Sequence, residues 1–105
     1  MIIDVLVAGS ANDQFYSNIA FLRRSLNWLG GDYRAARVVA ALGEWDLPEV
    51  PARWQPHLRD VDIIWSNPER APNPTYNAQH FDRFNHIRPE ADVALACDAD
   101  VCYVR

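Results

Sequence analysis

The sequence contains no lysine, and its ten basic residues, all arginine, face 14 acidic residues for a formal net charge of −4. The sequence also has no run of basic residues, and its negative net charge argues against general affinity for nucleic acid or anionic membrane. No apolar run approaches the roughly 20 residues of a membrane-spanning helix. The apolar start, residues 1–9, is short, lacks a basic segment and contains Asp4, unlike a secretory signal. We therefore expect a cytoplasmic protein that spans no membrane and binds no nucleic acid.

Cysteine is scarce, and its two positions, Cys97 and Cys102, lie close together in the sequence. In an extended segment their Cα atoms would lie beyond the roughly 4.4–6.8 Å that a disulfide allows. We expect two free thiols, the usual state in a reducing compartment.

Half of the 105 residues are hydrophobic, which is ordinary for a globular protein and enough for one small domain with a core. Residues 2–9 are rich in β-branched side chains and predict a strand that ends at Gly9. An amphipathic helix is expected next, begun by Asn12 or Asp13 and stopped by Gly30. Its apolar face is formed by Phe15, Ile19, Leu22, Leu26 and Leu29.

Residues 35–42 predict a second strand and residues 61–65 a third. The segment 44–60 between them contains three prolines and predicts irregular structure. Its tryptophans, Trp45 and Trp54, are expected to cover the sheet rather than bind a ligand.

A second helix is expected over residues 75–87, with Pro74 at its first position and Pro89 after its end. A fourth, apolar strand then begins at Val93 and ends at Asp98 and Asp100. This order predicts an α/β fold, a mostly parallel Rossmann-like sheet with flanking helices. Because ligands of such sheets bind beyond the carboxyl ends of the strands, we expect a site where these strands end.

Asp98 and Asp100 are separated by one alanine, so an extended backbone would direct both carboxylates to the same side. Two adjacent carboxylates repel each other unless a cation lies between them. Mg²⁺ and Mn²⁺ suit such oxygen ligands together with substrate phosphates. The same short pattern also occurs where aspartates simply form turns or cap helices.

The segment from Tyr76 to Val104, above all residues 93–101, resembles nucleotide-sugar glycosyltransferases of the GT-A fold, especially the glycogenin-like and galactinol-synthase-like group. The resemblance implies that Asp100 ligates Mn²⁺ or Mg²⁺ and that Asp98 contacts the metal or the ribose of the donor. It further implies a nucleoside-diphosphate sugar as ligand, with a UDP-sugar favoured.

By the same resemblance, Ala8 and Gly9 at the end of the first strand would face the nucleotide base. Arg83 is the nearest match to a basic residue directed toward the donor. Members of the family continue well beyond the position of Arg105, so the chain is expected to be a single domain equivalent to their donor-binding half, truncated after the aspartates and incomplete for catalysis.

Two other interpretations remain open at this point. Haloacid-dehalogenase-like phosphatases also place two aspartates after an apolar strand, the first as nucleophile and the second as general acid, with Mg²⁺. The remaining alternative is a small binding or assembly module without catalysis, in which an exposed sheet edge would favour a homodimer.

Overall fold

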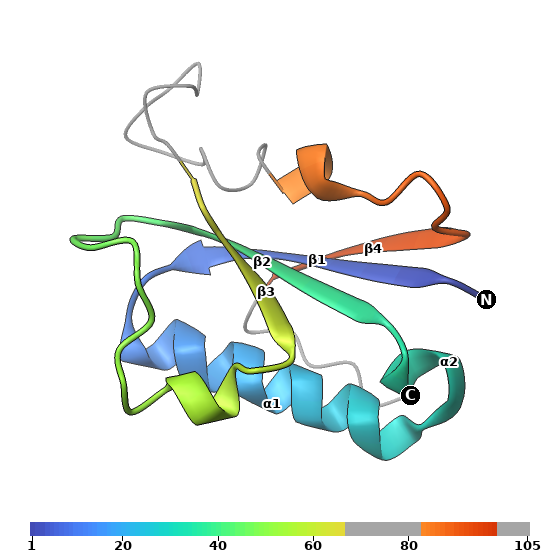
Figure 1. The fold of residues 1–105 in the computed structure, drawn as a ribbon, viewed down its shortest axis with the longest axis horizontal. Coiled ribbons are helices and arrows are strands. Elements are labelled where there is room, and N and C mark those ends of the chain that lie inside the picture. The colour runs from blue at the N-terminus through green and yellow to red at the C-terminus, as the bar shows by residue number, and fades with distance from the viewer. Residues whose placement is uncertain (67–82, 99–105) are drawn as a thin grey trace.

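The computed structural model describes residues 1–66 and 83–98 and contains one four-stranded parallel sheet in the order β3-β2-β1-β4 (Figure 1). The strands are β1 (Ile3–Ser10), β2 (Arg37–Gly43), β3 (Val61–Trp65) and β4 (Val93–Asp98). The helices are α1 (Asp13–Leu29), α2 (Gly31–Arg34) and the 3₁₀ turns η1 (Gln55–His57) and η3 (Arg83–His86). The predicted α/β class is confirmed, and the arrangement is Rossmann-like.

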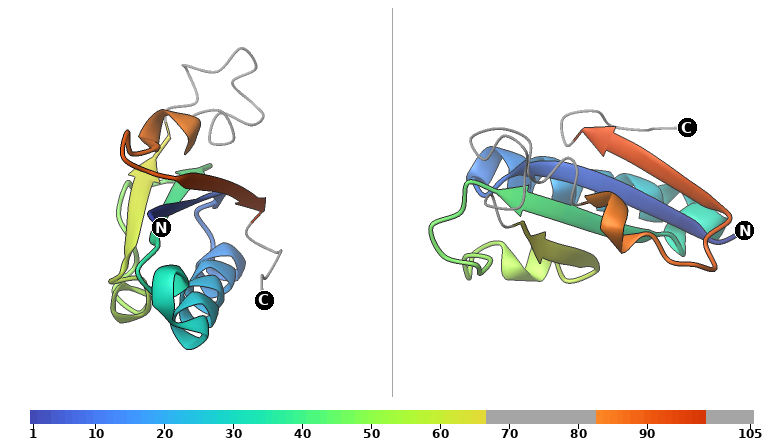
Figure 2. Two further views of the ribbon diagram at one scale, coloured as in Figure 1. Left: turned by 90° about the vertical axis from the view of Figure 1, so that its right-hand side faces the viewer. Right: turned by 90° about the horizontal axis from the view of Figure 1, so that it is seen from above.

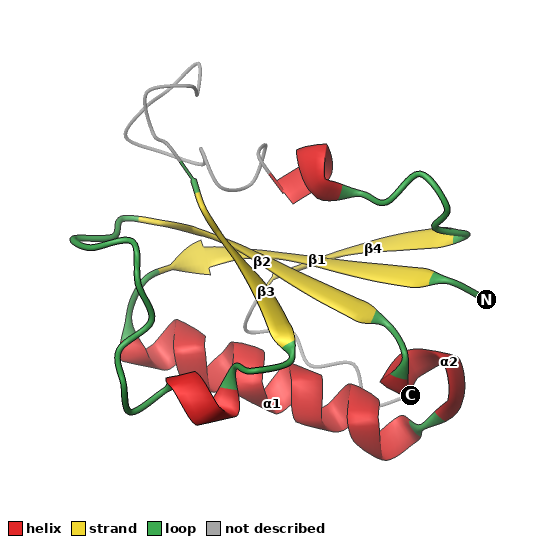
Figure 3. Cartoon of the chain, in the orientation of Figure 1, coloured by secondary structure: helices red, strands yellow, loops and turns green. Residues whose placement is uncertain are grey.

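Helix α1 covers one face of the sheet, as Figures 1 and 3 show. Alternate residues of β1 point toward it because successive strand side chains face opposite sides. The core between them includes Val5, Val7, Ile19, Leu22 and Leu26, all at most 3% exposed. The predicted apolar stripe of the helix is thus the surface that holds it against the sheet.

The ends of α1 lie where the sequence predicts them. The side chain of Asn12 accepts a hydrogen bond from the amide of Phe15 (3.0 Å), which satisfies one unpaired donor of the first turn. Gly30 ends the helix with φ at 72°, a left-handed conformation that favours glycine.

The short helix α2, which the sequence analysis missed, is held by a buried arginine. Arg23 is 6% exposed and donates to the carbonyls of Ala36 (2.6 Å) and Arg34 (2.9 Å). These bonds satisfy carbonyls at the end of α2 and before β2, so the guanidinium sets the turn between helix and strand.

The opposite face of the sheet is approached by η3 and the loop after it (Figure 2). Asp4 of β1 is fully buried there and accepts hydrogen bonds from Nε (2.6 Å) and the backbone amide (2.7 Å) of Arg88. Arg37 of β2 donates to Asp62 (2.6 Å) and to the carbonyl of His86 (2.8 Å). Charged groups therefore attach this segment to the strands.

Most predicted elements are confirmed, with one correction. The helix expected over residues 75–87 falls largely outside the described residues, and its described end is the 3₁₀ turn η3, which ends before Ile87. The carbonyl of His86 at the end of that turn accepts a hydrogen bond from Arg37 of β2, so the sheet holds the turn at its last residue.

The segment between β2 and β3 is irregular apart from η1, as predicted. Trp54 packs against the core, and Trp45 donates to the carbonyl of Ser66 (3.0 Å) beside the ring of Trp65. Cys97 is buried, and Cys102 lies outside the described residues. Within the described ranges no helix is long and apolar enough to cross a membrane.

Candidate functional site at the carboxyl edge of the sheet

The strand order reverses between β1 and β4, since β2 and β3 follow on one side of β1 and β4 lies on the other. In this pairing Ala8 is the register partner of Asp98. Open parallel α/β sheets bind ligands beyond the carboxyl ends of the strands at such a reversal. The structure therefore brings two of the predicted site positions together at the expected point of the fold.

Ala8 and Gly9 themselves offer little open surface. Ala8 is 2% exposed and lies on the face opposite α1, in register with Ala41. Gly9 lies against the aromatic ring of Phe15, and a Cβ added there would come within 2.4 Å of Phe15 Cδ1. The glycine is required for the turn into α1 to pack closely, which is a structural role.

Arg83 lies beside the end of β4. Its Nη1 donates to the carbonyl of Cys97 (2.9 Å), the residue before Asp98. The guanidinium also lies 5.0 Å from the ring centroid of Phe84, and its buried Nε has no hydrogen-bond partner among the described residues. The guanidinium is thus held beside the residue that precedes the predicted acidic position, and its part in binding a donor stays a prediction.

Asp98 is described only as the last residue of β4, and Asp100 lies outside the described residues. Within residues 1–66 and 83–98 no group of three or more potential metal ligands occurs. The two predicted ligands, Asp98 and Asp100, are carboxylates, the donor type that Mg²⁺ takes together with water and substrate phosphates.

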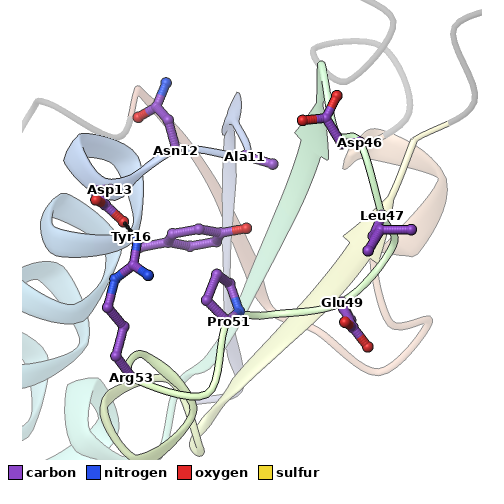
Figure 4. Close-up of a pocket in the computed structure, with 9 residues that line it drawn as sticks. All are labelled: Ala11, Asn12, Asp13, Tyr16, Asp46, Leu47, Glu49, Pro51 and Arg53. Atoms are coloured by element: carbon purple, nitrogen blue, oxygen red, sulfur yellow. Dashed lines mark hydrogen bonds and ion pairs between the residues drawn. The ribbon is translucent and has the colours of Figure 1, made fainter.

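A cavity of about 460 Å³ lies on the other side of β1, between the start of α1 and the segment after β2 (Figure 4). Its volume is within the range of small-molecule sites, about 300–1,000 Å³. The residues that line it are Ala11, Asn12, Asp13, Tyr16, Asp46, Leu47, Glu49, Pro51 and Arg53. None of these residues was a predicted ligand contact, although four of them are acidic or aromatic.

One wall of the cavity is fixed by an ion pair between α1 and the β2–β3 segment. Asp13 accepts hydrogen bonds from Arg53 and from the indole of Trp54 (2.8 Å). The hydrogen bond from Trp54, followed in size by that from Arg53, lowers the pKa of the Asp13 carboxyl below its usual value. Both charged side chains are more than half exposed, so the pair lies at the protein surface.

Tyr16 forms the buried wall. It is 3% exposed, and its ring lies 6.2 Å from that of Trp54. Burial, followed by the charge of Asp13, raises the pKa of the Tyr16 hydroxyl. The sequence analysis passed over this residue because it lies beside the apolar stripe of α1. The sequence signal that could have identified Tyr16 is its position in the first turn of the helix that follows β1.

These features define an open parallel α/β protein with a crossover and a cavity at one sheet edge. Comparison of the chain with models of protein families, with curated proteins and with solved structures finds no match. The function therefore has to be argued from the site itself.

Proposed function

We propose that the chain is the donor-binding part of a glycosyltransferase that binds a nucleoside-diphosphate sugar through a divalent cation. Asp98 and Asp100 are the proposed ligands of Mn²⁺ or Mg²⁺. The observation that carries the proposal is the register of β1 and β4, which pairs Ala8 with Asp98 where the strand order reverses. A carboxylate at that point is suited to a nucleotide whose phosphates share the cation.

Arg83 supports the proposal because its guanidinium contacts the carbonyl before Asp98. A fixed positive charge beside an acidic metal site attracts a diphosphate and lowers the repulsion between carboxylate and phosphate. When bound, the cation would supply Lewis-acid stabilisation of the negative charge on the departing diphosphate. The role of Arg83 is to orient the phosphates relative to β4.

The proposed location is the cytoplasm. The sequence has only two cysteines, too few for the dense disulfide framework of a small secreted domain. Nucleoside-diphosphate binding requires no particular compartment, so this part of the proposal depends on the cysteine content alone.

The proposal is tested by calorimetric titration of UDP and GDP with and without Mn²⁺. We expect binding that requires Mn²⁺ and that is lost in both Asp98→Asn and Asp100→Asn, because each substitution removes one anionic ligand. Glu90→Gln is the matched control, since Glu90 is an exposed acidic residue before β4, at the opposite end of that strand. It should leave the affinity unchanged.

Absence of any Mn²⁺-dependent binding, or equal loss in Glu90→Gln, would contradict the proposal. A beryllofluoride adduct that requires Asp98 would instead support a phosphatase, because beryllofluoride imitates a phosphorylated aspartate. Neither result depends on an acceptor substrate.

A further inference from the structure

The outer face of α1, which points away from the sheet, carries two exposed aromatic side chains. Phe21 is 50% exposed and Trp28 is 83% exposed. The two residues are seven positions apart, nearly two turns of a helix, so they lie on the same face. Figures 1 and 2 show α1 as an outer layer of the molecule, with the sheet on one side of it. Exposed apolar side chains grouped in this way mark interaction surfaces.

A hollow of about 240 Å³ lies between the two rings. Its lining is formed by Phe21, Arg24, Ser25 and Trp28. This spacing of i, i+3, i+4 and i+7 is that of the four residues that form a hole for a side chain of a facing helix in knobs-into-holes packing. The Ser25 hydroxyl donates to the carbonyl of Phe21 (2.9 Å), so it needs no donor or acceptor from a ligand. The hollow therefore fits an apolar side chain of another helix.

The hole belongs to a longer stripe along α1. Exposed or half-buried residues occupy its five heptad-spaced positions, namely Gln14, Ser17 with Asn18, Phe21, Arg24 with Ser25, and Trp28. The stripe is symmetric about Phe21, because each position before this residue has a counterpart at the same separation after it. An antiparallel copy of the helix therefore brings Trp28 opposite the partner's Gln14, Ser25 opposite the partner's Ser17, and Arg24 opposite the partner's Asn18.

Charge favours a second copy at this face. The chain has a net charge of −4, so two copies repel each other across most orientations. The stripe contains no carboxylate, and its one charged residue, Arg24, would face the neutral carboxamide of the partner's Asn18. The acidic residues near the two ends of α1 are already paired, Asp13 with Arg53 and Asp32 with the N-terminal amine (3.4 Å).

The area of the stripe sets the strength of the contact. Because an aromatic side chain buries about 150–250 Å², the exposed parts of Phe21 and Trp28 supply roughly 300 Å² per protomer. A stable interface buries about 800 Å² per partner. The other residues of the stripe are mostly small and polar, so they supply only part of the difference. We therefore expect a weak dimer, with a Kd of about 10–100 µM.

We propose that α1 pairs with α1 of a second copy in an antiparallel, two-fold symmetric dimer, in which Phe21 of each protomer enters the hole between Phe21 and Trp28 of the other. The inference is independent of the proposed nucleotide function, because the stripe contains none of the proposed ligand contacts. It also differs from a homodimer through a sheet edge, for which β4 and its Leu95 (38% exposed) would provide the surface.

Sedimentation equilibrium over about 5–500 µM measures the association. Trp28→Ala should weaken it about tenfold or more, because an interfacial tryptophan carries much of the binding free energy. Phe21→Glu should abolish it, because two carboxylates would meet at the symmetry axis. Both side chains are exposed, so neither substitution disturbs the core, and circular dichroism verifies that the fold is kept.

Two control variants change exposed leucines elsewhere. Leu47→Ala removes an apolar side chain that is 67% exposed in the segment after β2, and Leu95→Glu places a charge at the edge strand β4. Both should leave the Kd within about twofold of the unmodified chain, the range expected for a surface substitution away from the interface.

Disulfide cross-linking tests the register of the two helices. In a background of Cys97→Ala and Cys102→Ala, an equimolar mixture of Ser17→Cys and Ser25→Cys chains should form mixed disulfides on mild oxidation, because these positions face each other across the dimer. Each variant alone should cross-link poorly. Phe21→Cys should instead cross-link to its own copy, since a residue on a two-fold axis meets itself.

Three results would overturn the inference. These are a chain that stays monomeric up to about 500 µM, a Kd unchanged by Trp28→Ala, and cross-linking of Ser17→Cys chiefly to itself. Loss of the dimer in Leu95→Glu but not in Trp28→Ala would place the interface at the sheet edge instead. A monomer that binds phospholipid vesicles through Trp28 would make this face a lipid contact. None of these results alters the titration of UDP and GDP with Mn²⁺, so the dimer and the proposed function can fail separately.

Discussion

An ion pair lies near each end of β1, and the two pairs differ in how deeply they are buried. At the amino end, Asp4 is fully buried and receives both a side-chain and a backbone hydrogen bond from Arg88. At the carboxyl edge, Asp13 and Arg53 are both more than half exposed. A buried charge depends on its partner far more than an exposed one. The comparison indicates that the buried carboxylate at the amino end requires its partner, whereas the exposed pair at the carboxyl edge contributes little to stability.

The largest effect is expected from Arg88→Ala. The substitution leaves the Asp4 carboxylate buried without its guanidinium, which costs about 3–5 kcal/mol in the free energy of unfolding. Urea denaturation measures this loss, and Arg53→Ala is the matched control at the exposed pair, with a far smaller effect. Equal losses in the two variants would remove the distinction between the two ends.

The double variant Asp4→Leu with Arg88→Met sharpens this result. Replacing both members of a buried pair with apolar side chains of similar volume is often neutral or stabilising. Recovery of most of the stability would assign the loss to the uncompensated charge. Failure to recover would show that the hydrogen bond from Arg88 to the carbonyl of Ile3 (3.1 Å) also contributes.

A smaller effect is expected from Gly9→Ala, which tests whether packing holds the carboxyl edge. The new Cβ would lie 2.4 Å from Phe15 Cδ1, so the ring must move, at a cost of roughly 1–3 kcal/mol. Thermal unfolding measures the loss, and Gly9→Ala with Phe15→Leu should recover part of it because the smaller side chain leaves room. A neutral Gly9→Ala would mean that the ring has space to shift.

The smallest effect concerns the acid dependence of the exposed pair. The folded-state pKa of Asp13 is lowered from 3.8 by its bonds to Trp54 and Arg53. A lowered pKa means that the stabilisation is complete above the unfolded-state value and is lost as the pH falls below it toward the folded-state value. The stability difference between the unmodified chain and Asp13→Asn should therefore shrink below about pH 4, as urea denaturation at several pH values can measure. A constant difference would contradict the assignment.

Local pattern was sufficient for most of the fold. The alternation and β-branching of residues 2–9, the spacing of the apolar residues of α1, and the cap at Asn12 act between neighbours in the chain. When the apolar face of the helix packs on the sheet formed by these strands, the strands lie parallel and are joined by crossover connections. For the same reason the end of β4 at Asp98 was predictable, because an apolar strand ends where charge begins.

The rest depended on contacts between distant residues. Asp4 pairs with Arg88, 84 positions away, and nothing next to Asp4 in the sequence reveals its partner. The cavity likewise joins the start of α1 to a segment around Asp46, and Tyr16 becomes one of its walls only when these two parts meet. The sequence by itself determined the four strands, helix α1 and the acidic end of β4, because these follow from short-range periodicity. Only the tertiary structure decided which charges are buried and where a ligand can enter, because burial and cavities depend on how distant segments pack.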